Sequence, residues 1–286
     1  MLEIICLAAA AVAVFFLLVM AYDNSRFVIR KYHCSDRRIK KDLNVVLLSD
    51  LHSKSFGTGN QRLIKAIDKL SPDLILIAGD MYTAGKGQET DTAGDLVCQL
   101  AKRYPVYYGN GNHEHKTRLS PEVYGRMYEK YAERIGKSGI RHLVNEKAAL
   151  LELGVDIYGL ELGREYFGKF RSQKMEDGYL ERLLGKPRQT SYSILIAHNP
   201  DYFKDYAAWG ADLVVSGHVH GGLMRLPFLG GVISPAMKLF PEYDGGIFSE
   251  GNAEMVLSRG LGSHTLPIRI FNPGELILIR LTKGGR

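Results

Sequence analysis

Metal-binding residue types recur at five places in this chain of 286 residues, each directly after a short apolar run. The five blocks are Ser49-Asp50-Leu51-His52, Gly79-Asp80, Gly109-Asn110-Gly111-Asn112-His113-Glu114, Ala197-His198 and Ser216-Gly217-His218-Val219-His220. A single histidine after a strand is more often structural than a ligand, but five of the nine histidines lie in these blocks. Their donors are oxygen and nitrogen without a thiolate, which favours Mn, Fe, Zn or Co.

These donors are too many for one ion. Divided over two ions, they give each about four protein ligands if one carboxylate bridges, and they leave room for water and substrate. Two cations about 3.5–4 Å apart generate a hydroxide nucleophile from a shared water and neutralise charge on phosphoryl oxygens. Such a pair suits a phosphodiester, whose anionic oxygens repel hydroxide and whose alkoxide leaves poorly. The blocks therefore indicate dinuclear metal hydrolysis.

The apolar runs before the blocks predict strands that are buried on both faces. They are Asn44–Leu48, Leu74–Ala78, Val106–Tyr108, Ile194–Ala197 and Leu213–Val215. Helices are predicted at Gln61–Leu70, Thr92–Arg103, Pro121–Ile135 and Pro200–Trp209, and further strands at Ala148–Leu153, Asp156–Leu160, Met255–Leu257 and Leu276–Leu281. This alternation predicts an α/β fold with mixed sheets, in which the carboxyl ends of the strands bring the blocks to one site.

The five blocks, read as D-x-H, G-D, G-N-H-E, H and G-H-x-H in this order, resemble the calcineurin-like metallophosphoesterase family. The resemblance implies a four-layer αββα sandwich of two mixed sheets flanked by helices. The later stretches GHVHGGLMRLPF and SRGLG are similar to a branch of membrane-anchored bacterial phosphodiesterases, some of which hydrolyse UDP-2,3-diacylglucosamine. The expected activity is thus that of a metal-dependent phosphodiesterase.

The resemblance also implies roles for single residues. Asp50, His52 and His220 would bind the first of two divalent metal ions. Asn112, His198 and His218 would bind the second, and Asp80 would bridge both. Manganese is the first expectation for the metals, with iron, zinc or cobalt as alternatives. The Asn199-Pro200 pair after His198 varies from the family pattern but leaves the ligand itself intact.

His113 is the expected catalytic residue. It is adjacent to Asn112 but is expected to stay off the metals, where its proton could pass to the leaving oxygen or stabilise the transition state. Glu114 and His115 are expected to be structural or to orient the ligands. His33, His142 and His264 are expected to be structural, and His264 would join the site only if the fold brings it near.

The expected substrate is phosphorylated and lipid-linked. The stretch Leu223–Phe240 follows the last block and has only Arg225 and Lys238 as charges. It is either a core loop with a strand or an apolar rim of the site beside a membrane, with Arg225 binding the substrate phosphate. The reaction would be hydrolysis of a phosphodiester or pyrophosphate bond. The alternatives are a phosphomonoesterase on a soluble substrate, a hydrolase of a non-phosphate bond, and a non-catalytic metal-binding membrane scaffold.

The N-terminus predicts a membrane helix. Ile4–Tyr22 is a run of nineteen residues without a charge, close to the roughly 20 needed to cross the hydrocarbon layer. A cleaved signal peptide and a buried core helix are the alternatives, although no Lys or Arg precedes the run. The predicted organisation is a transmembrane anchor at 1–22, a basic juxtamembrane linker at 23–42 and a metallophosphoesterase domain at 43–286.

The charge distribution predicts the orientation of that helix. Residues 1–42 carry +3 of the net charge of +6, and the basic residues follow the apolar run. The positive-inside rule then predicts a single-pass protein of the cell membrane with its catalytic domain in the cytoplasm. The three cysteines show no metal-type spacing, in agreement with a reducing compartment. The remaining excess of +3, without a basic stripe interleaved with aromatics, argues against nucleic acid as a partner.

Overall fold

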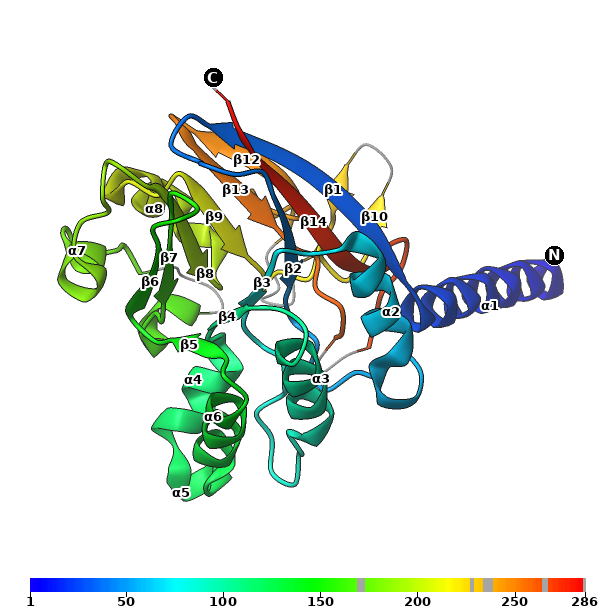
Figure 1. Ribbon diagram of the computed structural model, residues 1–286. Coiled ribbons are helices and arrows are strands. Elements are labelled where there is room, and N and C mark those ends of the chain that lie inside the picture. The colour runs from blue at the N-terminus through cyan, green and yellow to red at the C-terminus, as the bar shows by residue number, and fades with distance from the viewer. Residues whose placement is uncertain (169–172, 227–228, 234–238, 264–266, 285–286) are drawn as a thin grey trace.

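The computed structural model of the protein describes residues 1–168, 173–226, 229–233, 239–263 and 267–284. Two six-stranded mixed sheets form its centre, with strand orders β1-β14-β2-β3-β4-β5 and β12-β13-β9-β8-β7-β6 (Figure 1). The first sheet consists of β1 Phe27–Asp36, β14 Gly274–Lys283, β2 Leu43–Leu48, β3 Leu74–Ala78, β4 Val106–Gly109 and β5 Arg141–Leu143. The second consists of β12 Gly246–Glu250, β13 Ala253–Leu257, β9 Leu213–Ser216, β8 Tyr192–Ala197, β7 Val155–Leu160 and β6 Glu146–Leu150.

Helices cover the outer faces of both sheets. The first sheet packs against α2 Gln61–Leu70, α3 Asp91–Ala101 and α6 Met127–Lys137. The second packs against α7 Tyr179–Leu184 and α8 Phe203–Trp209. The other elements are α1 Leu2–Ser25, α4 Asn112–Leu119, α5 Pro121–Tyr124, the short ribbon β10 Arg225–Leu226 with β11 Gly230–Gly231, and 3₁₀ turns at Thr58–Asn60, Arg164–Phe167 and Pro200–Tyr202.

Three hydrophobic cores separate the four layers. Along β2, Val46 and Leu48 point to the helices of the first sheet, whereas Val45 and Leu47 point to the second sheet. This alternation follows from the two-residue period of a strand, and it explains why a strand buried on both faces is a continuous apolar run. The predicted four-layer αββα sandwich is confirmed.

Two of the predicted helices differ in the structure. The helix predicted over Pro121–Ile135 is divided into α5 and α6, because Gly125 between them has a φ of 60° that a helix cannot contain. The helix predicted from Pro200 begins with a 3₁₀ turn and becomes α8 at Phe203. Neither difference moves a metal-binding block.

The linker expected at 23–42 has to be corrected, because half of it is a strand of the first sheet. Its residues 27–36 form β1, which pairs in parallel with β14 along its whole length. β1 is an edge strand, and its exposed polar side chains made it resemble a solvated linker. The domain therefore includes β1.

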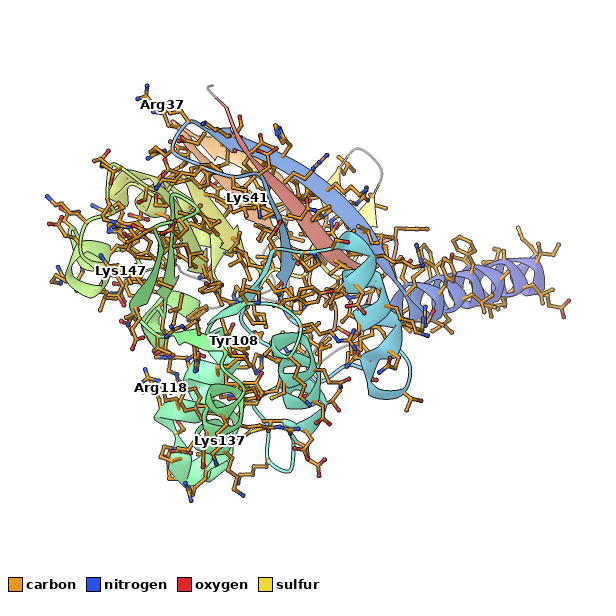
Figure 2. The ribbon with its side chains drawn as sticks, viewed as in Figure 1. Arg37, Lys41, Tyr108, Arg118, Lys137 and Lys147 are labelled. Carbon is orange, nitrogen blue, oxygen red and sulfur yellow. The ribbon has the colours of Figure 1, made fainter. Side chains whose placement is uncertain are left out.

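β1 also separates most of these basic residues from α1. Ten residues in a strand extend about 33 Å, so Arg37 and Lys41 follow the end of β1 that is remote from α1, and Figure 2 shows Arg37 there. Arg38 pairs at that end with Asp36 and Asp212. Of the seven basic residues in the segment, only Arg26, Arg30 and Lys31 precede or lie in the first half of β1.

The N-terminal helix α1 projects from the body of the molecule (Figure 1). It is long and apolar enough to cross a membrane, and only Asp23 of its residues is buried. The alternative of a buried core helix is therefore wrong. An uncleaved anchor stays a prediction, with a cleaved signal as its alternative.

Candidate metal centre

The five blocks converge at one edge of the two sheets. Strands β2, β3 and β4 run parallel in the first sheet, and β8 and β9 run parallel in the second. Their carboxyl ends therefore meet, and the Nδ1–H of His198 after β8 donates to the carbonyl of Ala78 in β3 at 2.5 Å. This hydrogen bond links the two sheets directly beneath the ligands.

Asp50, His52 and His220 form the first ligand group. Their donor atoms all lie within 4.8 Å of one another. The Nε2 atoms of His52 and His220 are 3.2 Å apart, and the His220 Nε2 is 3.5 Å from Asp50 Oδ1. The His220 Nδ1 lies 3.3 Å from the carbonyl of Gly262, so it carries the proton and directs the Nε2 lone pair into the group.

The second group adjoins the first through Asp80. The donor atoms of Asp80, His198 and His218 lie within 4.8 Å of one another. A donor atom of Asp80 also lies within 4.8 Å of one of His52. The His198 Nε2 is 3.1 Å from Asp80 Oδ2, and the His218 Nδ1 is 2.8 Å from Asn112 Oδ1. All seven predicted ligands thus lie together, with the Asp80 carboxylate between the two groups.

Charge and hydrogen bonding at this place fit bound cations. The His198 Nε2 is buried, and the carboxylate of Asp80 lies 3.1 Å from it. Burial opposes a charged imidazole, but the carboxylates of Asp80 and Asp50 outweigh it and raise the pKa of His198 to about 10. Burial raises the pKa of Asp50 to about 6. The field of the carboxylates therefore favours positive charge where Nε2 points, as a metal ion would supply.

Comparison with known proteins identifies this arrangement. The model of the calcineurin-like phosphoesterase family matches residues 43–222, which contain all five blocks. The chain belongs to this family. It is accordingly a hydrolase that acts on phosphoesters, and in this family the site typically binds two metals.

Several relatives of this phosphoesterase are similar over most of its length. The uncharacterized metallophosphoesterase YkuE of Bacillus subtilis is 27% identical over 244 residues, which cover 83% of this chain and 78% of YkuE. The UDP-2,3-diacylglucosamine pyrophosphatase LpxG of Chlamydia muridarum is 26% identical over 288 residues, which cover 83% of each chain. A transmembrane protein with metallophosphoesterase domain from Danio rerio is 26% identical over 250 residues, covering 84% of this chain and 53% of that protein.

The backbone of this phosphoesterase is strained at the ligands themselves. Left-handed φ angles of 49° to 73° occur at five of the seven predicted ligands, namely Asp50, His52, Asp80, His218 and His220. Such angles are uncommon outside glycine and persist where the surrounding structure enforces them. A Cβ at Gly111 or Gly217 would overlap the carboxylates of Asp80 and Asp50, respectively, so only glycine permits these loops to approach the ligands.

His113 is held with its Nε2 facing the ligands. The backbone N–H of Ala84 donates to its Nδ1 at 2.8 Å, and its own backbone N–H donates to Asp80 Oδ1 at 2.8 Å. Burial lowers the pKa of His113, which favours the neutral ring. Because Nδ1 accepts a hydrogen bond, the neutral ring carries its proton on Nε2, 3.9 Å from Asp80 Oδ2. This tautomer can donate a hydrogen bond from Nε2 but has no Nε2 lone pair for a metal.

Glu114 holds the backbone next to the ligands Asp80 and Asn112 in place. Its carboxylate accepts hydrogen bonds from the backbone N–H groups of Asp80, Met81 and Gly111 at 2.9–3.0 Å. It also accepts one from the hydroxyl of Tyr108 at 2.6 Å, a residue labelled in the interior of Figure 2. Its neighbour His115 instead contacts Glu161, with Nδ1 3.1 Å from Oε2. Glu114 therefore ties the ends of β3 and β4 together.

Replacing Glu114 by glutamine is expected to lower the free energy of unfolding by about 2–4 kcal/mol. The amide NH₂ cannot accept, so two of the four donors lose their partner, and each buried unpaired group costs about 1–3 kcal/mol. Urea unfolding of the metal-free protein, followed by circular dichroism, measures the change. Glu122→Gln on the exposed face of α5 is the matched control, and equal midpoints for the two variants would contradict this role.

Two residues that the sequence analysis missed support the site from the C-terminal segment. The buried guanidinium of Arg269 donates to four backbone carbonyls, those of Arg259, Gly260, Gly262 and Asn272. This holds the loop whose Gly262 N–H donates to the carbonyl of Asp50 at 2.7 Å. The side chain of Asn272 donates to the carbonyl of His220 at 2.7 Å. No local pattern marks either residue, since both act through backbone that is distant in sequence.

Arg225, the predicted substrate-binding residue, is engaged within its own loop. Its guanidinium donates to the carbonyls of Gly221 at 3.1 Å and Asp244 at 2.8 Å, and it pairs with the Asp244 carboxylate at 3.0 Å. These contacts hold the β10–β11 ribbon, and substrate contact by Arg225 stays a prediction. His264 and Lys238 lie outside the described residues.

Proposed function

We propose that this phosphoesterase hydrolyses a phosphodiester or pyrophosphate bond in a membrane lipid intermediate, with two divalent metal ions as cofactors. The observation that carries the proposal is the position of Asp80 between two groups of ligands that are buried or half-buried, with the Nε2–H of His113 beside it. The likeness to LpxG, named for a pyrophosphate bond in a lipid-linked nucleotide, supports this class of substrate.

Asp50, His52 and His220 would hold one ion, Asn112, His198 and His218 the other, and Asp80 both. When bound, the ions lower the pKa of water and neutralise charge on the phosphoryl oxygens. Manganese is the preferred pair, with iron, zinc or cobalt as alternatives, because the donors are oxygen and nitrogen.

The contribution of the chain itself is positioning and hydrogen bonding to the leaving oxygen. Ala84 fixes the His113 tautomer so that Nε2–H is available to the leaving oxygen. Glu114, Arg269 and Asn272 hold the backbone around the ligands, so that the strained loops need no rearrangement during the reaction. Burial of the ligands excludes bulk water and strengthens each of these interactions.

The test is hydrolysis by the full chain in detergent, reconstituted in turn with Mn²⁺, Fe²⁺, Zn²⁺ or Co²⁺. The substrates are bis-p-nitrophenyl phosphate, p-nitrophenyl phosphate and a UDP-linked diacyl glucosamine. We expect cleavage of the lipid-linked pyrophosphate and the diester over the monoester. Faster cleavage of the monoester would contradict the proposal, and absence of hydrolysis with every metal would favour the scaffold alternative.

We also propose a single-pass topology with the catalytic domain in the cytoplasm. Arg26, Arg30 and Lys31, which follow α1 in sequence, support this orientation by the positive-inside rule. A C-terminal alkaline phosphatase fusion is expected to be inactive and a green fluorescent protein fusion bright. The reverse pattern would place the domain outside the cell.

A further inference from the structure

A small β layer connects the end of α1 with the metal centre. It consists of residues 223–226, 229–233, 239–240 and 270–271, and is called the docking layer below. The backbone N–H of Arg225 donates to the carbonyl of Ile270 at 3.0 Å, that of Val232 to Met224 at 2.9 Å, and that of Phe240 to Val232 at 2.9 Å. These segments, although separated in sequence, therefore form one surface.

The docking layer is unusually apolar on its exposed side. Ten large hydrophobic side chains beyond residues 1–25 are exposed in the described part of the protein, and five of them belong to this layer. They are Leu226, Leu229, Leu239, Phe240 and Phe271. Leu239 is 66% exposed and Phe271 44% exposed. An apolar surface gathered in this way marks an interaction site.

The layer contacts α1 at residues that precede the C-terminal end of the helix. The ring centroid of Phe271 is 6.4 Å from those of both Phe15 and Phe16. The end of α1 is fixed by two hydrogen bonds, from the Asn272 N–H to Asp23 Oδ2 at 2.9 Å and from Asn24 Nδ2 to the carbonyl of Pro267 at 2.7 Å. The helix and the docking layer are therefore held together at two levels.

These contacts set the depth of the layer. Arg26 lies over the ring of Tyr22 at 4.4 Å, a pair typical of the level of the lipid headgroups. Phe16 precedes Tyr22 by six residues, which is about 9 Å along the helix axis. If α1 crosses the bilayer with Tyr22 at the headgroups, Phe271, beside Phe15 and Phe16, lies deeper in the bilayer, among the acyl chains.

We propose that the docking layer inserts into the lipid bilayer beside α1, and that the metal centre opens at the membrane surface. The occupant of the apolar surface is lipid, because the layer is continuous with α1, which is long and apolar enough to cross a membrane. Asn272, adjacent to Phe271, donates to the carbonyls of His220 and Gly222 at 2.7 Å each. One residue thus connects the embedded ring to a metal ligand. A lipid substrate would then reach the site without leaving the membrane.

The experiment uses the full chain in phosphatidylcholine and phosphatidylglycerol vesicles with brominated acyl chains, which quench tryptophan at short range. The natural Trp209 in α8 is kept as a constant reference. Phe271→Trp is the main reporter, Leu239→Trp a second reporter on the same layer, and Val12→Trp a reporter within α1. Val123→Trp, at an exposed apolar position of α5, is the matched control.

We expect quenching of the added emission in Phe271→Trp, Leu239→Trp and Val12→Trp, and none in Val123→Trp. Quenching at residue 12 without quenching at 271 and 239 would overturn the proposal, as would a second copy of the chain that shields the layer from lipid. Absence of quenching at residue 12 would also overturn it, since α1 would then lie outside the bilayer. The proposal does not depend on the reaction, so its failure leaves the proposed function standing.

Discussion

Replacing His113 by alanine is expected to lower turnover by about 10²–10⁴-fold, the usual contribution of a side chain positioned to donate to the leaving oxygen. The variant should retain the metal content of the unmodified protein, because His113 itself has no free ring nitrogen for a metal. Its Nδ1 accepts from the N–H of Ala84, and its neutral ring has a proton on Nε2. Steady-state rates with a diester and metal analysis by mass spectrometry measure the two quantities side by side.

The leaving group sharpens the test of His113. A proton donor matters most for a basic alkoxide and least for p-nitrophenolate, so the loss should be larger with an alkyl diester than with the chromogenic one. His33→Ala, on the edge strand β1, is the control and should retain full activity. A parallel loss of metal and turnover in His113→Ala would refute the assignment and make His113 a ligand.

Replacing Asp80 by asparagine is expected to remove most of the activity, by roughly 10³-fold or more, since the ions supply several kcal/mol of transition-state stabilisation. The variant loses the negative charge that lies between the two ligand groups, at 3.1 Å from His198 Nε2. Metal content measured after gel filtration is expected to fall in the same variant.

Asp91→Asn is the matched control for Asp80→Asn, because Asp91 is an exposed carboxylate of α3 that pairs with Arg134. The control should keep both metals and full turnover. Two bound metals and normal rates in Asp80→Asn would contradict the bridging role. The circular dichroism spectrum of each variant shows whether the fold is intact.

The central strands could be predicted from the sequence because they are buried on both faces. Leu74–Ala78 has five consecutive buried apolar residues, and the structure places β3 at these positions. The edge strand β1 could not be predicted, because one edge and one face are exposed and its sequence contains Arg30 and Lys31. The pattern reports burial, and it fails where a strand is only partly buried.

The helix α4 could not be predicted, for a related reason. Its sequence, Asn112–Leu119, is almost entirely polar and has no apolar stripe, although His113, Glu114, His115 and Thr117 are buried. These residues are polar, and hydrogen bonds at the site, not hydrophobic contacts, compensate for their burial. A ligand block can therefore be found from its residue types while the element that carries it cannot.

Supporting residues were the least accessible to prediction. Asn272 and Arg269 act on the backbone of His220 and Gly262, and these contacts exist only in the folded chain. The ligands, in contrast, are marked by their own side chains and by their place after strands. Positioning by distant backbone leaves no local signal.

The pairing of β1 with β14 decides which fragment is suitable for biochemical work. A fragment that starts at residue 43, where the family match begins, would lack β1. The apolar strand β14 would then be an exposed sheet edge, which favours aggregation. It would also lack the carboxylate of Asp23 that accepts from Asn272. The shortest fragment that keeps both contacts begins at Asp23.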